Sequence, residues 1–333
     1  MTRVSVMGTG SWGTTFAVVL ADAGAKVTMW GRRPEVCAEI AEQHRNRDYL
    51  GELELPSTIS ASADPALALD GADVVVLAVP SQSLRANLTA WLPFLPSGSV
   101  LVSLMKGVED GTSLRMSEVI AEVTGAGPDR VAVISGPNLA GEIARRQPTA
   151  TVVACAVQEV GEQLAAVCSA AYFRPYTNTD LIGVELGGAV KNVIGLAVGI
   201  AEGMGLGDNT KATIITRGLA ETSRLGVAMG AEPATFSGLA GMGDLVATCA
   251  SPLSRNKTFG VHLGRGMLLP EVIAITNRTA EGVKSCGPIL EMARARGVDM
   301  PIIEAVTRIV HDGHPISEMA GRLLSRDLKS ELD

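Results

Sequence analysis

Short apolar runs alternate with polar, helix-like segments through the first half of the chain. Continuous apolar runs are typical of strands that are buried on both faces of a parallel sheet. The predicted strands are 4–7, 26–30, 58–60, 74–79, 100–104, 131–135, 149–154 and 173–176, with predicted helices at 14–23 and 35–42. The alternation predicts an α/β fold with a Rossmann-like, doubly wound, mostly parallel sheet that binds ligands at the carboxyl ends of its strands.

The pattern changes near residue 180, where strand signals give way to long segments of helical spacing. Helices are predicted over 183–204, 208–229, 269–275, 287–296, 302–311 and 316–324. We therefore expect two domains, a Rossmann-like domain over residues 1–180 and a mostly α-helical domain over residues 181–333.

A glycine-rich turn, Gly8-Thr9-Gly10-Ser11-Trp12-Gly13, joins the first predicted strand to the first predicted helix. A strand, a GxGxxG turn and a helix in this order are typical of a dinucleotide-binding unit. Gly8 would make the turn, Gly10 would let the backbone approach a pyrophosphate, and Gly13 would let the helix pack on the strand. The motif alone could be only a turn, but the flanking elements favour nucleotide binding.

Arg32 and Arg33 follow the second predicted strand, about twenty residues beyond the turn, where an NAD-specific site usually has an acidic residue for the ribose 2′-hydroxyl. Guanidinium groups suit the 2′-phosphate of NADP instead. NADP is therefore favoured and NAD stays possible, because an ordinary solvent-exposed arginine pair would produce the same pattern.

Two lysines are candidates for proton transfer. Lys191 is the only charged residue between Glu185 and Glu202, on an apolar predicted helix. A buried ammonium is costly without a partner, and a desolvated lysine can act as a general acid or base near neutral pH. The alternative is a lysine that reaches the helix surface. Lys106 follows a buried strand and precedes Gly107, so it would lie either at the ligand crevice or in a surface loop.

Two polar clusters in the second half could contact a ligand. The segment 238–244 is a glycine-rich loop that ends in Asp244, and it could be a connector or a place where backbone approaches a ligand. Ser254-Arg255-Asn256-Lys257 combines a hydroxyl, a guanidinium, an amide and an ammonium. These groups suit a phosphate, although a solvated polar turn is the alternative.

Composition narrows the class of protein. The chain has 333 residues, of which 47% are hydrophobic, and a net charge of −7, which argues against nonspecific binding to nucleic acid or to an anionic membrane surface. The five cysteines are scattered and the four histidines lack metal-ligand spacing, so we expect buried reduced thiols and no metal. No uncharged apolar run has the length of a membrane span, and a cytoplasmic protein is expected.

Several motifs follow one another in a fixed order along nearly the whole chain. They are Gly8-Thr9-Gly10-Ser11-Trp12-Gly13, Asn46 with Tyr49-Leu50, Val79-Pro80-Ser81-Gln82, Lys106-Gly107 before Glu109, Ser135-Gly136-Pro137-Asn138-Leu139-Ala140 with Glu142, Lys191-Asn192, Gly241-Met242-Gly243-Asp244-Leu245, Ser254-Arg255-Asn256 and Glu281-Gly282. In this order the motifs resemble those of bacterial NAD(P)-dependent glycerol-3-phosphate dehydrogenases.

The resemblance implies roles for the matching residues. It implies Lys191 as the proton acceptor and Lys106 where cofactor and substrate meet. The implied substrate contacts are Lys106, Gly136, Asn138, Lys191, Asp244, Ser254, Arg255 and Asn256. The implied cofactor contacts are Gly8, Gly10, Ser11, Trp12, Gly13, Arg32, Arg33, Lys106, Ala140, Arg255, Thr279 and Glu281. Asn138, where many relatives have Ser or Thr, and Thr279, where an aliphatic residue is usual, depart from the family pattern.

The implied reaction is reversible hydride transfer between NAD(P)H and dihydroxyacetone phosphate, which gives sn-glycerol 3-phosphate for phospholipid synthesis. The resemblance also implies a homodimer. One alternative is a related two-domain dehydrogenase of another small hydroxy or keto acid. The other is a non-catalytic NADP-binding redox sensor, against which the two lysines and the cluster at Ser254 argue.

Overall fold

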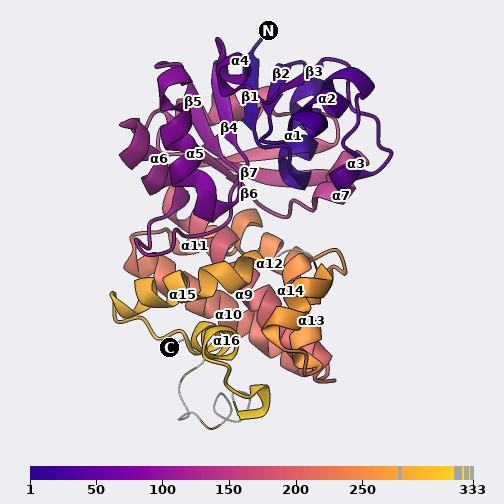
Figure 1. Ribbon diagram of the computed structural model, residues 1–333. Helices are drawn as coiled ribbons and strands as arrows, with labels where there is room; N and C mark the ends of the chain where they lie inside the picture. Colours follow the sequence, from indigo (N-terminus) through magenta and orange to yellow (C-terminus); the bar gives the residue numbers. More distant parts are fainter. Residues whose placement is uncertain (277–279, 319–324, 326–329, 331–333) are drawn as a thin grey trace.

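The computed structural model describes residues 1–276 and 280–318, together with 325 and 330. Figure 1 shows a sheet flanked by helices, formed by the first half of the chain, above a bundle of helices formed by the second half. The predicted fold class, a Rossmann-like sheet followed by a mostly α-helical part, is confirmed.

The strands lie in one eight-stranded sheet in the order β3-β2-β1-β4-β5-β6-β7-β8. Neighbouring strands are parallel except β6 and β7, which are antiparallel. The strand order reverses between β1 and β4, and ligands of such sheets bind at this switch point. The strands are β1 (Arg3–Met7), β2 (Lys26–Trp30), β3 (Ile59–Ser62), β4 (Val74–Leu77), β5 (Val100–Ser103), β6 (Val131–Ser135), β7 (Thr149–Cys155) and β8 (Phe173–Asn178).

Helices cover the sheet, which explains why every residue of β4 and β6 is buried. The helices of this half are α1 (Ser11–Asp22), α2 (Pro34–Gln43), α3 (Arg47–Leu50), α4 (Pro65–Leu69), α5 (Leu84–Trp91), α6 (Met116–Thr124), α7 (Ala140–Ala144) and α8 (Gln158–Val167), with short 3-10 turns η1 (Ser81–Ser83) and η2 (Leu92–Phe94).

The predicted strands all form, with ends that shift by one or two residues. β4 ends at Leu77, and Ala78 then packs under the glycine turn, since a Cβ on Gly8 would lie 2.4 Å from the Ala78 carbonyl oxygen. Residues 81–83 form a 3-10 turn, and Ser83 stands at the N-cap position of α5 with its hydroxyl donating to the Pro80 carbonyl at 2.8 Å.

The second half packs around one apolar helix, α9 (Leu181–Gly203). Its neighbours are α10 (Asp208–Ala228), α11 (Pro233–Phe236), a π-helical turn η3 (Leu239–Gly243), α12 (Asp244–Ala250), α13 (Arg255–Gly264), α14 (Leu269–Thr276), α15 (Glu281–Arg294) and α16 (Pro301–His311). By length and composition α9 could cross a membrane, but 83% of its apolar window is buried among these helices. It is the core helix of this half.

Glycines bring α13 close against α9. Gly199 on α9 lies against the α13 backbone, where an added Cβ would come within 2.1 Å of the Lys257 carbonyl oxygen. Gly260 and Gly264 on α13 approach the α9 backbone in return, with added Cβ atoms 2.2 Å from the carbonyl oxygens of Leu196 and Ile200. This contact holds α13 along the C-terminal part of α9.

Two predicted elements of this half differ in the structure. The predicted loop at 238–244 forms a π-helical turn that continues into α12. α15 begins at Glu281, six residues before the predicted start, because Gly287 and Pro288 are accommodated inside the helix. The predicted helix at 316–324 lies mostly outside the described residues. All five cysteines are buried and free, as expected.

Candidate active site

Two lysines and one aspartate meet between the sheet and the helical bundle. The Lys106 Nζ lies 2.6 Å from Asp244 Oδ2, and the Lys191 Nζ lies 3.0 Å from Asp244 Oδ1. The side chains of Lys106, Lys191 and Asp244 are 15%, 12% and 3% exposed. One carboxylate therefore orients two ammonium groups, and the cluster keeps a net positive charge that suits an anion.

The sheet topology places Lys106. Lys106 lies three residues beyond the end of β5, and its Nζ also donates a hydrogen bond to the Gly136 carbonyl at 2.9 Å. Gly136 follows β6, which is the parallel neighbour of β5. The carboxyl ends of adjacent parallel strands thus bring these two predicted residues together.

The Lys191 side chain is only 12% exposed and lies against α12, which contradicts the alternative of a lysine that reaches the helix surface. Its Nζ donates to the Thr248 hydroxyl at 2.6 Å in addition to its ion pair with Asp244. Asp244 and Thr248 lie four residues apart on α12, on the same face of the helix. Thr248 is not among the residues predicted from the sequence, although its spacing of four residues from a candidate carboxylate is a signal that indicates it.

Burial is the main reason that the pKa of Lys106 falls from 10.5 to about 8. Asp244 opposes this shift by attraction, and the charge of Lys191 adds to it by repulsion. Lys106 is therefore protonated at neutral pH and loses its proton as the pH rises through about 8.

A chain of side-chain amides ties three helices to the Lys106 backbone. Asn192 Nδ2 donates to the Lys106 carbonyl at 3.1 Å, and Asn256 Nδ2 donates to Asn192 Oδ1 at 2.9 Å. Asn256 Oδ1 accepts from the Gly282 backbone N–H at 2.9 Å. The predicted substrate residue Asn256 thus has its carboxamide partly occupied within the protein.

The polar cluster at Ser254 begins α13 rather than forming a solvated turn. The Ser254 hydroxyl accepts the Lys257 backbone N–H at 3.3 Å, which makes it the N-cap of the helix. Arg255 is exposed at the first helical position. A helix start with an adjacent guanidinium suits a phosphate or a carboxylate.

Unpaired polar atoms lie beside Gly136. Asn138 Nδ2 donates to the Thr151 hydroxyl at 3.0 Å, whereas Asn138 Oδ1 and the Ser135 hydroxyl are buried without a partner among the described residues. Buried polar atoms normally have a partner, so these atoms fit a bound ligand with hydroxyl or amide groups.

The glycine turn has the geometry of a dinucleotide site. A Cβ on Gly13 would lie 2.4 Å from the Gly8 carbonyl oxygen, whereas a Cβ on Gly10 would meet no atom within 4 Å. α1 begins at Ser11 with no side-chain cap on its free N–H groups, and the buried Trp12 Nε1 has no partner within the described chain. These residues fit a pyrophosphate at the helix start.

The two candidate arginines differ in their surroundings. Arg33 pairs with Asp48 at 2.7 Å, between its Nη2 and the carboxylate Oδ2, whereas Arg32 is exposed on the same turn. Both lie beyond the carboxyl end of β2, beside the strand that carries the glycine turn. This is the side of the sheet on which the adenosine end of a dinucleotide lies in such folds.

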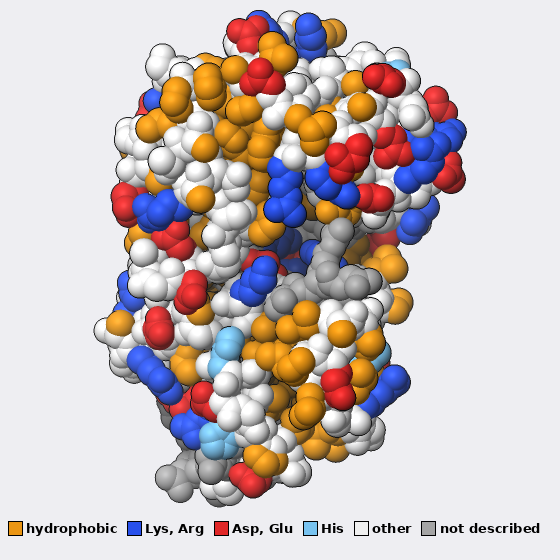
Figure 2. Space-filling view, viewed as in Figure 1, with side chains coloured by type: hydrophobic (Ala, Val, Ile, Leu, Met, Phe, Trp, Pro, Cys, Tyr) orange, Lys and Arg blue, Asp and Glu red, His pale blue; other side chains and the backbone are white. Residues whose placement is uncertain are grey.

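The remaining predicted cofactor residues occupy both halves of the chain. Ala140 begins α7, and its carbonyl accepts the Thr15 hydroxyl of α1 at 3.3 Å. Glu281 begins α15 and accepts a hydrogen bond from the Ser81 hydroxyl, just beyond β4. Thr279 lies outside the described residues. Figure 2 shows basic side chains around the hollow between the two halves.

No group of three or more His, Cys, Asp or Glu side chains within the described ranges has the arrangement of a metal site. A Rossmann-like sheet with a dinucleotide turn, joined to helices that supply a largely enclosed lysine, is typical of nicotinamide-dependent dehydrogenases.

Comparison with known proteins identifies the family. Residues 3–161 match the family model described as NAD-dependent glycerol-3-phosphate dehydrogenase N-terminus, and residues 180–321 match the corresponding C-terminus. The chain is 64% identical to a glycerol-3-phosphate dehydrogenase [NAD(P)+] of Streptomyces griseus, covering 99% of this chain and 98% of that protein. It is 60% identical to the protein of the same name from Thermobifida fusca, with 99% of each chain covered.

A solved structure agrees with these matches. The crystal structure of glycerol-3-phosphate dehydrogenase from Coxiella burnetii superposes with a TM-score of 0.92 at 35% identity, covering 98% of this chain and 99% of that chain. The chain belongs to the NAD-dependent glycerol-3-phosphate dehydrogenase family. The predicted resemblance is confirmed, and the redox-sensor alternative loses its support.

Proposed function

We propose that the chain catalyses the reversible reduction of dihydroxyacetone phosphate to sn-glycerol 3-phosphate with a reduced nicotinamide dinucleotide. The observation that carries the proposal is 64% identity over almost the full length of a dehydrogenase of that name. The buried cluster of Lys106, Lys191 and Asp244 supports it, because the reduction of a ketone needs a proton donor and a cation beside the carbonyl oxygen.

Lys191 is the proposed acid. When bound, the nicotinamide would supply the hydride to the carbonyl carbon. Lys191 holds a proton at Nζ and delivers it to the carbonyl oxygen as negative charge develops there, and it takes the proton back in the oxidation direction. Lys106 stabilises the same developing charge, and Asp244 keeps both ammonium groups aimed at one point.

The phosphate of the substrate would bind at the start of α13. Arg255 supplies a planar guanidinium, while Ser254 and Asn256 supply a hydroxyl and the remaining amide N–H. Gly136 and Asn138 would line the side nearest Lys106, where Asn138 Oδ1 has no partner among the described residues. Holding the phosphate far from the reacting carbon positions a very small substrate.

The cofactor would lie along the carboxyl edge of the sheet. The turn at Gly8, Gly10 and Gly13, with Ser11 and Trp12, would hold its pyrophosphate, and Arg32 with Arg33 would favour the 2′-phosphate of NADP over NAD. Further proposed cofactor contacts are Lys106, Ala140, Arg255, Thr279 and Glu281.

The proposal extends to the organisation of the protein. We propose a cofactor-binding domain over residues 1–180 and a catalytic domain over residues 181–333, since α9 begins at Leu181, directly after the last strand. The reaction as proposed uses lysines and needs no metal. On the basis of the family resemblance, we also propose that the protein is cytoplasmic and forms a homodimer.

The test measures the loss of reduced nicotinamide absorbance after dihydroxyacetone phosphate is added to the purified protein, with NADPH and NADH compared. We expect oxidation of both, faster with NADPH. Lys191→Ala should lose about 10³-fold in kcat and keep cofactor affinity, because only the proton donor is removed. No oxidation of either dinucleotide by the wild-type protein would refute the proposed function, and near-normal turnover of the variant would remove Lys191 from the mechanism.

A further inference from the structure

Glu185 is a buried carboxylate that links the two halves of the molecule. It lies on α9 with 7% of its surface exposed, and it reaches across to the start of α6. Its Oε1 accepts the Ser117 backbone N–H at 2.8 Å, and its Oε2 accepts the Ser117 hydroxyl at 2.6 Å and pairs with Arg115 Nη1. Glu185 thus caps a helix that belongs to the sheet half.

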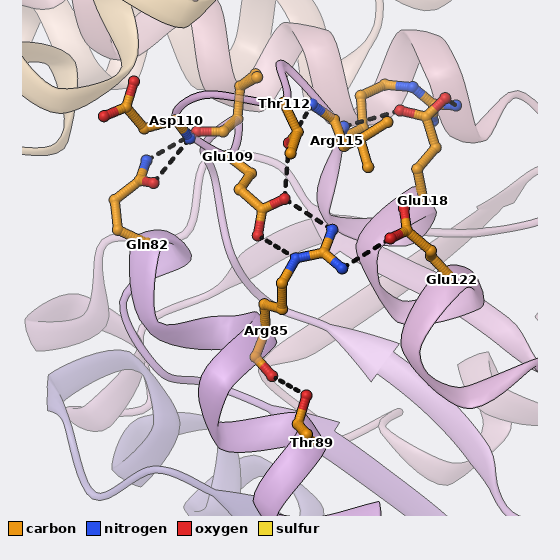
Figure 3. Close-up of polar contacts among 11 residues, drawn as sticks. Gln82, Arg85, Thr89, Glu109, Asp110, Thr112, Arg115, Glu118 and Glu122 are labelled. Carbon is orange, nitrogen blue, oxygen red and sulfur yellow. Dashed lines mark hydrogen bonds and ion pairs between the residues drawn. The ribbon is translucent and has the colours of Figure 1, made fainter.

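The capped helix end is also the end of the segment that carries Lys106. Residues 104–115 connect β5 to α6, and Arg115 is the N-cap of α6. Within the sheet half, Glu118 accepts the Arg115 backbone N–H at 2.8 Å and pairs with its guanidinium at 2.9 Å (Figure 3). Glu185 adds the contact that joins this end of the segment to α9.

The middle of segment 104–115 is held from α5 and η1. Gln82 donates to the Val108 carbonyl at 2.8 Å and accepts the Asp110 backbone N–H at 2.9 Å, and Arg85 makes two hydrogen bonds to Glu109, at 2.9 and 2.8 Å (Figure 3). These contacts shape the segment within the sheet half. Toward the helical half, Val108 packs in the apolar core of that half, and the Ser113 hydroxyl donates to the Pro288 carbonyl at 3.5 Å.

One face of α9 contacts both ends of the segment. Asn192 donates to the Lys106 carbonyl at 3.1 Å, and Glu185 holds Arg115 and Ser117. The two α9 residues are seven positions apart, about two helical turns, so they point to the same side. Lys191 lies next to Asn192 on this helix. Any slip of the segment along α9 would therefore change how Lys106 and Lys191 share Asp244.

We propose that Glu185 is a positioning residue that sets the geometry of the Lys106–Asp244–Lys191 cluster through segment 104–115. This proposal rests on the proposed function, in which Lys191 transfers the proton and Lys106 stabilises the developing charge. The side-chain contacts of Glu185 are with Arg115 and Ser117. Glu185 acts by anchoring the end of the segment opposite Lys106. Its ion pair with Arg115 and its hydrogen bonds from Ser117 at the start of α6 hold this end against α9.

The test is Glu185→Gln, which keeps the shape of the side chain and removes its charge. We expect kcat to fall about tenfold because breaking one partner of a buried charge pair loosens the contact. The KM for the dinucleotide should change less than twofold. The pH at which kcat falls on the basic side should shift, because the substitution alters the surroundings of Lys106. Ser117→Ala removes a hydroxyl that donates to Glu185 at 2.6 Å and accepts from Arg115 at 3.1 Å, and it leaves the Arg115–Glu185 ion pair in place, so it should give a smaller loss in the same direction.

Glu221→Gln is the matched control. Glu221 is also a buried glutamate that caps a helix from a distance, since it accepts the Ile302 backbone N–H of α16 at 3.0 Å. Its hydrogen bonds go to the backbone of Ile302 and Ile303, and none among the described residues reaches segment 104–115, so kcat and the pH profile should stay at wild-type values. Equal kinetic losses in Glu221→Gln and Glu185→Gln would show a merely structural role and overturn the proposal.

A second readout works without turnover. Acylation of Lys106 by acetic anhydride, measured by mass spectrometry at pH 8, should be several-fold faster in Glu185→Gln than in the wild-type protein or Glu221→Gln. Unchanged acylation together with unchanged kcat would overturn the positioning role. Absence of wild-type turnover would refute the proposed function alone, because the acylation rates still report whether Glu185 holds the segment.

Discussion

At the scale of single residues, Asp244 determines how the two lysines behave. Its two carboxylate oxygens bind one ammonium each, and its own side chain is 3% exposed. Both lysines and the aspartate were candidates from the sequence, but separate ones. The ion pair of Lys106 with Asp244 joins residues 138 positions apart, a separation at which no local sequence pattern exists.

The first prediction concerns the pH dependence of activity. Because the protonated Lys106 has a pKa of about 8, kcat/KM for ketone reduction should fall as the pH rises through that value. Asp244 raises the pKa of Lys106, so Asp244→Asn should move this limb to lower pH. Lys106→Arg should move it upward, since a guanidinium stays charged. Rate profiles from pH 6 to 10 that show an unmoved limb in both variants would contradict the assignment.

At the scale of elements, α9 organises the site. It carries Lys191 and Asn192, contacts segment 104–115 through Glu185, and packs on α13 through glycines. Apolar spacing predicted this helix almost to its ends. Its contacts could not be predicted, because a glycine in a sequence does not say which backbone approaches it.

The second prediction is that Gly199→Ala separates α9 from α13. The added methyl would overlap the Lys257 carbonyl, which is backbone and cannot move alone, so stability should fall by about 1–3 kcal/mol and turnover should drop as Ser254 and Arg255 shift. Gly161→Ala on α8 is the control, because its Cβ meets only ordinary contacts, the closest at 3.7 Å. Urea unfolding and steady-state kinetics of the two variants should diverge, and equal stabilities would argue against close packing at Gly199.

At the scale of the whole molecule, buried carboxylates make folding sensitive to pH. Glu221 is 1% exposed, and burial is the main reason that its pKa rises from 4.5 to about 7, against the backbone hydrogen bonds from Ile302 and Ile303. A raised pKa means that the folded state binds the proton more tightly than the unfolded state. This contribution to stability is present below pH 4.5 and is lost as the pH rises through about 7.

The third prediction follows from that sign. Between pH 5 and pH 8 the free energy of unfolding of the wild-type protein should fall by about 2.5 kcal/mol relative to that of Glu221→Gln, which has no titrating carboxyl at this position. Unfolding in urea at the two pH values measures this difference, and other groups cancel because both proteins carry them. A difference that stays constant with pH would exclude Glu221 as the titrating group.

The sequence by itself determined the order of strands and helices, the dinucleotide turn and the candidate lysines, because apolar periodicity and glycine spacing act over a few residues. Tertiary structure alone decided what those residues meet. Lys191 donates a hydrogen bond to Thr248, 57 positions away, and Arg115 pairs with Glu185, 70 positions away. Such partners depend on how the sheet and the bundle pack, and packing is a property of the whole chain, since each contact forms only after distant segments have been brought together.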